Sequence, residues 1–264
     1  MKQALTKKLI LLVTGATILV ASVAFGITKV RSVLNGSRAT ATRLERLPRV
    51  MLWAWERPTD LRFINPKETG VAFLARTIRL RSHEISIRPR LQPLNLPEGT
   101  TVVAVARVET DKADLSAQQR EKLAGAIADM ASLPNVSHIQ IDFDAVQSER
   151  QFYRDVITDV RRRLPDNVAL SITALASWCT FDDWISDLPI DEAVPMLFRM
   201  AADGKQIAHR LNAGEDFSSS ACRHSYGISM DEPRSNLSAA RRLYVFNPDP
   251  WTESSVRAIL ESRK

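Results

Sequence analysis

Ile139-Gln140-Ile141-Asp142-Phe143-Asp144 is the stretch that decides the fold. Apolar and polar residues alternate along it with the period of two that is typical of a β-strand. Alternate side chains of a strand point to opposite faces, so Asp142 and Asp144 share one face. Burying carboxylates is costly unless they are paired or used. Because α/β folds carry their chemistry at the carboxyl ends of their strands, the stretch predicts a strand that ends at a functional site.

Seven further segments have the composition of strands. They are residues 49–55, 70–75, 101–108, 168–175, 193–198, 227–230 and 243–246. Capping boxes that begin at Ser116 and Ser148 predict helices between several of these strands. Thr180 is expected to cap a short helix that contains Trp184, and Asp249 to start the last helix.

Eight strands with helices between several of them predict an α/β fold, a (β/α)8 TIM-like barrel. Residues 77–80 and 84–88 alternate around a polar turn, which predicts a β-hairpin in place of a helix. The barrel is therefore expected to be irregular in its first third. The alternative is an open doubly wound sheet, although no glycine-rich phosphate-binding fingerprint follows any strand.

The N-terminal segment is expected to target the chain to a membrane. Residues 9–28 carry no charge, lysines precede them, and about 20 such residues are enough to cross a bilayer. Small residues at 22–24 also suit signal-peptide cleavage, so residues 1–28 are either a signal anchor or a signal peptide. We expect residues 29–47 to be a flexible tether and 48–264 to be the barrel domain. These features predict a protein that is anchored in a membrane or exported, which in a bacterium means the cell envelope or the periplasm.

The charge of the folded part argues against a nucleic-acid partner. The whole chain has a net charge of +6, with 36 basic and 30 acidic residues. Residues 1–38 hold six basic residues and no acid, so 30 basic and 30 acidic residues remain. A neutral domain lacks the basic footprint that nucleic-acid binding requires.

The two cysteines, Cys179 and Cys222, permit one disulfide in an exported protein. Both follow predicted strands, on loops that can share one rim. The alternative is two unrelated buried thiols.

Polar and aromatic side chains gather where the predicted strands end, on what would be one rim of the barrel. The candidate ligand-binding residues are Trp55, Glu56, Arg107, Glu109, Trp178 and Arg199. Acids and arginines beside flat aromatic rings suit a polar ligand with apolar faces, such as a sugar. Trp178 has an equal alternative role, packing under a loop.

Four carboxylates are candidate catalytic residues. Asp142 and Asp144 follow the fourth strand, and Asp231 and Glu232 follow the seventh. Glycoside hydrolysis needs such a pair, one group to protonate the leaving oxygen and one to attack or to activate water. We assign Asp144 as the acid/base and Asp231 or Glu232 as its partner. Arg107 is placed to pair with Asp142, which has a purely structural role as its alternative.

No metal or cofactor is expected. The four histidines show no ligand spacing, and no third carboxylate stands close to the Asp142–Asp144 pair in the sequence. The chain also lacks a nucleophile-elbow serine motif and a cysteine–histidine signature.

Several long motifs resemble a family of uncharacterised bacterial proteins, domain of unknown function 3142. The motifs are Val50–Pro58, Gly70–Ala75, Arg88–Leu94, Gln140–Ala145, Ser171–Cys179 and Pro195–Met200, and the resemblance covers roughly residues 48–250. The family has no established activity, and its members look like distant relatives of barrel-type glycoside hydrolases.

The fourth strand also resembles the chitinase-type Asp-x-Asp-x-Glu motif, with Asp142 and Asp144 on its two aspartates. Val146 stands where that motif has its catalytic glutamate. The resemblance therefore implies that any hydrolysis uses Asp144 itself or an acid from another strand. Two functions follow as expectations: a glycan-binding barrel that also hydrolyses its ligand, and a non-catalytic barrel that binds envelope polysaccharide or a protein partner.

Overall fold

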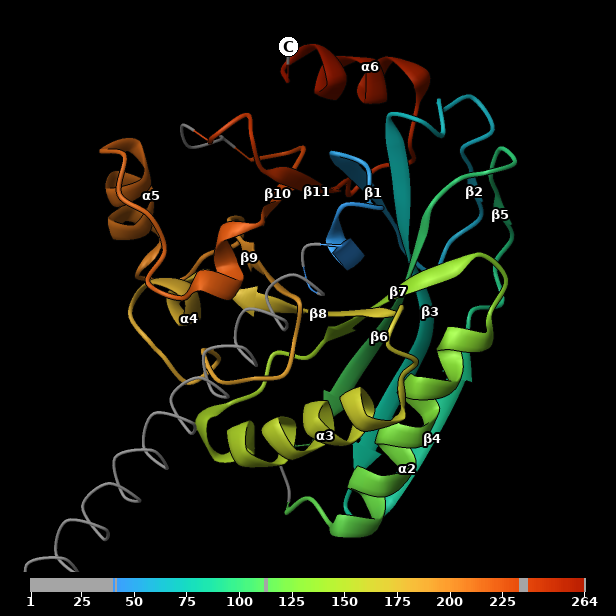
Figure 1. Ribbon diagram of the computed structural model, residues 1–264, viewed down its shortest axis with the longest axis vertical. Coiled ribbons are helices and arrows are strands. Elements are labelled where there is room, and N and C mark those ends of the chain that lie inside the picture. Colours follow the sequence, from blue (N-terminus) through green and yellow to red (C-terminus); the bar gives the residue numbers. More distant parts are fainter. Residues whose placement is uncertain (1–39, 41, 112–113, 233–236, 264) are drawn as a thin grey trace, which may run out of the picture. The chain divides into compact units, whose positions relative to one another are not determined.

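The computed structural model describes residues 40, 42–111, 114–232 and 237–263. These form an α/β fold built on a closed barrel of eight parallel strands (Figure 1). In chain order the barrel strands are β1 (Val50–Ala54), β3 (Thr69–Arg81), β6 (Val102–Thr110), β7 (Val136–Asp142), β8 (Ala169–Leu175), β9 (Glu192–Met196), β10 (Ser225–Ser229) and β11 (Arg242–Phe246). The first strand closes the barrel, because β1 pairs in parallel with β3 on one side and β11 on the other.

The first third of the barrel is irregular, as the sequence predicts. β3 continues past the barrel and pairs antiparallel with β4 (Glu84–Pro89), and Figure 1 shows the two strands running together. Two short strands that the sequence analysis did not foresee, β2 (Thr59–Asp60) and β5 (Leu94–Asn95), pair in parallel beside them. Helices follow the later strands: α2 (Ala117–Ala128), α3 (Arg150–Arg163), α4 (Ala176–Thr180), α5 (Gly204–Asn212) and α6 (Glu253–Glu261), with one-turn 3-10 helices at Asp129–Ser132, Gln147–Glu149 and Ser220–Arg223.

Three expected helix starts differ from the structure. The last helix begins at Glu253 with Thr252 as its cap, and not at Asp249. Ser148 lies in the 3-10 helix before α3 and does not cap it.

The short helix expected after Thr180 is also in a different place. Thr180 ends α4 instead of capping a helix through Trp184. Its hydroxyl donates a hydrogen bond back to the carbonyl of Ala176 at 2.8 Å, so it is not available to cap a helix that follows. The chain turns after α4, and Ile185 is fully buried.

The strands separate two apolar cores. Val50, Leu52 and Ala54 of β1 face outward and pack with helix residues such as Ile157 of α3. Met51 and Trp53 face inward and pack with side chains of four other strands, Ala72, Val103, Val105, Val194, Tyr244 and Phe246. The alternation along β1 thus decides which side chains fill the barrel.

Residues 43–47 pack against this barrel, although the sequence analysis expected the tether to reach 47. Leu44 and Leu47 are buried in the interior core, and the compact unit begins at Arg43. Arg43 pairs with the buried carboxylate of Asp191, just before β9. Arg242, at the start of β11, donates a 2.7 Å hydrogen bond to the carbonyl of Leu44. The segment therefore lies at the amino ends of these strands.

The N-terminal membrane segment and most of the tether lie outside the described residues. Within the described ranges, no helix has the length and apolar character needed to span a bilayer.

Cys179 and Cys222 form the disulfide that the sequence analysis expected. It joins α4 to the 3-10 helix before β10, and both residues are fully buried. Structural disulfides persist in oxidising compartments, so the bond is consistent with a location outside the cytoplasm.

Candidate functional site

The carboxyl ends of the barrel strands form a rim, called the mouth below. Asp142, the last residue of β7, is held there by the strands on either side. Arg107 Nη1 on β6 donates to one carboxylate oxygen at 2.7 Å, and Thr173 Oγ1 on β8 donates to the other at 2.8 Å. Arg107 and Asp142 are direct partners in the strand register, so the pairing follows from the fold. Asp142 is buried and has both oxygens occupied, which suits a positioning role.

The ion pair continues outward from Asp142. Arg107 Nε lies 3.4 Å from Glu109, and Arg79 Nε on β3 donates to Glu109 at 2.7 Å. The bond from Arg79 is the main reason that the pKa of Glu109 lies below its ordinary value. Burial disfavours the charge on Arg107, but its attraction to Asp142 and the neighbouring carboxylates raises its pKa overall. Both groups therefore stay charged.

Asp144 has different surroundings from Asp142. It lies in the loop just after β7, and its side chain is exposed at the surface. Within the described part of the chain, its carboxyl has no hydrogen-bond or ion-pair partner. Partial desolvation and the charge of Asp142 raise the pKa of Asp144, and Arg107 opposes this shift. Asp144 thus keeps its proton to a higher pH than an ordinary aspartate.

Asp231 and Glu232, after β10, are bound to Arg199, after β9. Arg199 Nη2 lies 3.0 Å from Asp231, and the backbone N–H of Arg199 donates to both Glu232 oxygens at 3.0 Å. Ser229 also donates a hydrogen bond to Asp231, and this bond contributes most to lowering the pKa of that carboxyl. The φ of Arg199 is 50°, a left-handed conformation that is costly for arginine and is often found at functional sites. Glu232 stabilises this turn through the backbone N–H.

An aromatic cluster lies under part of the mouth, with Trp55 and Phe198 partly exposed above buried rings. Trp55, which follows β1 and is half-buried, has its ring centroid 6.0 Å from Phe246 at the end of β11. The Phe246 ring is in turn 4.7 Å from Phe198 and 4.4 Å from Trp53, which stacks on it from inside the barrel. Flat apolar rings beside charged groups are the combination that carbohydrate sites use.

Two of the predicted ligand-binding residues have other surroundings. Trp178 is only 3% exposed, and its ring packs edge-on against Trp184 at 4.9 Å, so it is not available to stack on a ligand. The alternative of packing under a loop is the correct one, because α4 begins directly after β8 and carries Trp178 into the outer core. Glu56 accepts a hydrogen bond from the N–H of Leu91 at 3.0 Å, which directs it to the connection after β4.

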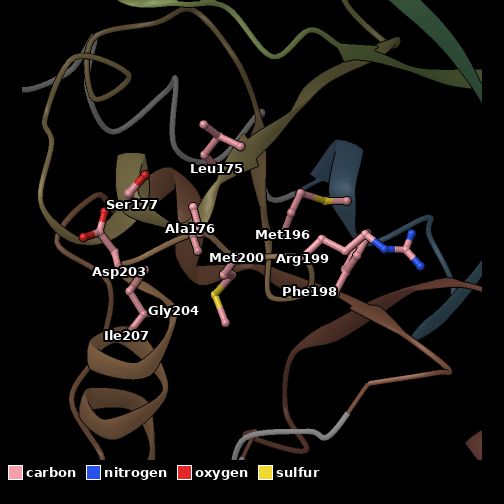
Figure 2. A pocket seen from close by; sticks show the side chains of 11 residues that line it. Leu175, Ala176, Ser177, Met196, Phe198, Arg199, Met200, Asp203, Gly204 and Ile207 are labelled. Carbon is pink, nitrogen blue, oxygen red and sulfur yellow. The ribbon is translucent and has the colours of Figure 1, made fainter.

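A pocket opens between the ends of β8 and β9 and the start of α5 (Figure 2). Its volume is about 140 Å³. Leu175, Met196, Phe198, Met200 and Ile207 give it a mainly apolar lining, and Ser177, Arg199 and Asp203 add polar groups. Arg199 and Phe198 belong also to the mouth, so the pocket is continuous with it.

Several of these residues are not evident as site residues from the sequence. Thr173 has an inward position by strand parity, the signal that would have found it. Phe198 and Phe246 lie at the ends of predicted strands, and their contribution to the site depends on the pairing order of the strands. Leu175 is exposed, although leucine at a strand end usually indicates core.

Across the described residues, no group of three or more His, Cys, Asp or Glu side chains is arranged to hold a metal ion. The buried histidine, His138, faces the barrel interior, where its Nε2 is 2.8 Å from Ser171 Oγ.

Comparison with known families gives one match. Residues 98–203 match Domain of unknown function (DUF3142). The match runs from just before β6 to the residue before α5, so it includes Arg107, Asp142, Asp144 and all of the pocket lining except Gly204 and Ile207. It covers less of the chain than the motifs quoted above. No curated protein matches the sequence.

Proposed function

We propose that the mouth of the barrel binds a glycan of the bacterial cell envelope and hydrolyses it, with Asp144 as the acid and Asp231 as its ionised partner. The substrate rests against Trp55 and Phe198, which Phe246 supports from beneath. Arg107, Asp142 and Thr173 position the groups around it. The activity belongs to the glycoside hydrolase class and uses no metal or cofactor.

The observation that carries this proposal is the opposite environment of the two acids. Partial desolvation and a neighbouring negative charge raise the pKa of Asp144, whereas Ser229 and Arg199 lower that of Asp231. Two carboxyls whose pKa values are pushed apart are suited to acid and base roles at the same pH. They follow β7 and β10, which are separated by β8 and β9 around the barrel and so lie on different sides of the mouth.

In the proposed reaction, protonated Asp144 gives its proton to the glycosidic oxygen as the bond to the anomeric carbon breaks. Asp231 takes a proton from a water molecule, whose oxygen forms the new bond to that carbon. One water is consumed, and each chain end gains a hydroxyl. Asp231 then releases its proton to solvent and Asp144 takes one up from solvent, which restores the starting state.

The proposed location is the cell envelope, with residues 1–28 as a membrane anchor or a cleaved signal. The uncharged run in that segment and the Cys179–Cys222 disulfide support it.

A second candidate is a barrel that binds envelope polysaccharide or a protein without turnover. Val146 stands at the position of the chitinase-type glutamate, and Arg199 engages both Asp231 and Glu232. A site whose acids are neutralised in this way retains a binding surface while losing the free base that hydrolysis requires.

Activity and binding on fluorogenic glycosides and bacterial polysaccharides distinguish the two candidates. For the hydrolase, Asp144→Asn is expected to lower turnover by about 10²–10⁴-fold while leaving binding within a few-fold. Asp182→Asn, another loop aspartate that is held by Arg150, is the control. Binding without turnover favours the second candidate. If no glycan binds and Asp144→Asn changes nothing, both glycan functions are wrong at this site, and only binding of a protein partner remains.

A further inference from the structure

β4 forms an open edge of the barrel sheet. It pairs antiparallel with β3 on one side, and among the described residues no strand pairs with its other side (Figure 1). Such an edge readily accepts a further strand, because its outer backbone N–H and carbonyl groups are unpaired. Natural proteins usually protect an edge with lysine or proline. β4 has no lysine, and its proline, Pro89, is its last residue.

The backbone groups that this edge offers belong to Ile85 and Ile87. The N–H of Arg90, directly after β4, donates to the carbonyl of Ala75 on β3 at 2.9 Å. Along an antiparallel strand, residues alternate between those whose backbone groups face the partner and those whose groups face away. The even-numbered residues of β4 therefore bond to β3, and the N–H and carbonyl groups of Ile85 and Ile87 point outward.

The side chains of β4 follow a self-complementary order. Ile85 packs against the outer core, and Ile87, on the same face, is 42% exposed. Glu84, Ser86 and Arg88 are exposed on the opposite face. The strand thus reads acid, isoleucine, serine, isoleucine, base. A second copy that runs in the opposite direction presents the same order with the charges exchanged.

We propose that β4 pairs antiparallel with β4 of a second copy of this chain, centred on Ser86, an inference that does not depend on the proposed function. In this register Ile85 and Ile87 exchange backbone hydrogen bonds with Ile87 and Ile85 of the second copy. Arg88 lies directly opposite Glu84 of the second copy, and Glu84 lies opposite its Arg88. Opposite charges directly across two strands stabilise their pairing, whereas like charges destabilise it.

Other ways of pairing the two edges lose these contacts. A shift by two residues places Ser86 opposite Arg88 or opposite Glu84, so neither charge pair forms. A shift by one residue sets the outward groups of one chain opposite groups that already bond to β3. Parallel pairing in register places like charges opposite each other. The charge pattern therefore selects the antiparallel register centred on Ser86.

The dimer joins two polar faces into one surface that leads to both mouths. The polar face of β4 continues on β3 with Arg79, which lies opposite Ser86 in the register. Arg79 donates to Glu109 at 2.7 Å, and Glu109 lies 3.4 Å from Arg107 Nε at the mouth. The two-fold axis of an antiparallel pair is perpendicular to the sheet, so both copies present this face on the same side. A long polymer is then able to contact both sites, which raises its apparent affinity.

Single cysteines test the register directly, because the two native cysteines are already joined to each other. In the proposed pairing the two Ser86 positions form a non-hydrogen-bonded pair with Cα atoms about 4.5 Å apart, within the range of a disulfide. In the full chain in detergent, Ser86→Cys is expected to cross-link to itself on mild oxidation. Glu84→Cys and Arg88→Cys are expected to cross-link mainly when mixed. Preferential cross-linking of Ser86→Cys to Arg88→Cys would show another register and contradict the inference.

The strength of association is measured by sedimentation equilibrium of the full chain in a density-matched detergent. A short edge buries little surface, so we expect a Kd on the order of 10 μM. Ile87→Pro removes an N–H that β3 does not use, and is expected to weaken the dimer by about tenfold or more while β4 still pairs with β3. Ile87→Val keeps the N–H and is the matched control, expected to dimerise like the wild type.

An exchange of charges tests the pairing without a change in the backbone. Arg88→Glu places like charges opposite each other and is expected to weaken the dimer by about tenfold. The double variant Glu84→Arg/Arg88→Glu is expected to restore the wild-type Kd within a few-fold. A wild type that stays monomeric at about 100 μM, or a dimer that neither Ile87→Pro nor Arg88→Glu weakens, overturns the inference. Either result leaves the proposed function standing, because glycan turnover is measured separately.

Discussion

At the scale of single residues, Asp142 and Asp144 are two positions apart and have opposite environments. Asp142 is buried and held by Arg107 and Thr173, whereas Asp144 is exposed and unpaired within the described residues. The alternation of the sequence placed both on one face of a strand, but β7 ends at Asp142. The difference between them depends on side chains of β6 and β8, which are distant in sequence.

The raised pKa of Asp144 predicts how a substitution affects stability. A carboxyl whose pKa is raised in the folded state stabilises the fold below its ordinary pKa of 3.8, and this contribution is lost as pH rises through the folded value. Asp144→Asn is therefore expected to raise the unfolding midpoint at pH 7, with the difference from wild type shrinking as the pH falls below 4. Thermal unfolding at a series of pH values measures this. A variant that is less stable than wild type at pH 7 would contradict it.

Thr173→Val is expected to destabilise the protein by about 1–3 kcal/mol, because it leaves one oxygen of the buried Asp142 carboxylate without a donor. Thr173→Ser keeps the hydroxyl and is the matched control, with most of the stability retained. Urea unfolding measures both. Equal losses in the two variants would show that packing of the methyl group, and not the hydrogen bond, is what matters.

At the scale of elements, the sequence predicted all eight barrel strands and the β3–β4 hairpin. The alternation of apolar and polar residues and the short apolar runs were sufficient to predict these strands, because each strand is long enough to show the two-residue period. The short strands β2 and β5 were missed, since two residues carry no periodicity. The helix near Thr180 was predicted in the wrong place, because threonine commonly caps the start of a helix. Here the Thr180 hydroxyl donates a hydrogen bond to the carbonyl of Ala176, four residues earlier in the chain.

The same shift of α4 explains why the candidate site was predicted only in part. The paired roles of Asp142 and Arg107 followed from strand parity and are present. Strand parity did not predict the burial of Trp178, because this burial depends on α4, which begins directly after β8 ends at Leu175. The pocket was not foreseen either, since it lies between α5 and two strand ends, and that packing has no local sequence signal.

The disulfide is expected to be a major source of stability for the elements around β9. It joins α4 to the 3-10 helix before β10 across a sequence separation of 43 residues. Loop-closure entropy then gives about 4 kcal/mol of stabilisation. The Cys179→Ala/Cys222→Ala variant is expected to lose about that amount in denaturant unfolding.

Each single variant, measured under reducing conditions, is the control for packing of the thiol. If the free energy of unfolding of the double variant is less than about 1 kcal/mol below that of the oxidised protein, the disulfide does not stabilise the fold by restricting the unfolded chain.

At the scale of the whole molecule, the barrel interior is divided into an apolar part and a polar part. The apolar part centres on Trp53 and Phe246. In the polar part, Glu192 is fully buried and accepts hydrogen bonds from Arg242 at 2.9 Å and Tyr244 at 3.0 Å. Gln140 donates to Ser171, which also contacts His138. Such a network specifies one strand register, since a slipped strand would leave these groups unpaired.

His138 makes the stability of the whole barrel sensitive to acid. Burial lowers its pKa from 6.5 to about 4; Arg242 adds to this effect, and Glu192 and Asp191 oppose it. Between these values the unfolded chain binds a proton that the folded chain does not, so stability falls as pH decreases from 6.5 towards 4. The full effect is about 3 kcal/mol.

His138→Gln is expected to flatten this dependence. Urea unfolding at pH 7, 6 and 5 measures this pH dependence. These pH values lie above the range in which ordinary carboxylates titrate, so His138 is the group that is tested. An NMR titration of wild-type His138 checks the cause without any substitution, because the ring is expected to remain neutral down to about pH 5. A ring that titrates near 6.5 would contradict the explanation.

The position of β1 between β3 and β11 determines when the chain is able to fold. β1 is synthesised early, but β11 begins only at Arg242 of 264 residues. A chain that is made or exported from its N-terminus therefore holds an open sheet until its last segment arrives, and such long-range pairing is slow. Cys222 precedes β11, so the disulfide is able to form before the barrel closes. A chain cut short before β11 would keep unpaired strand edges on β1 and β10, which favours aggregation over an open but functional barrel.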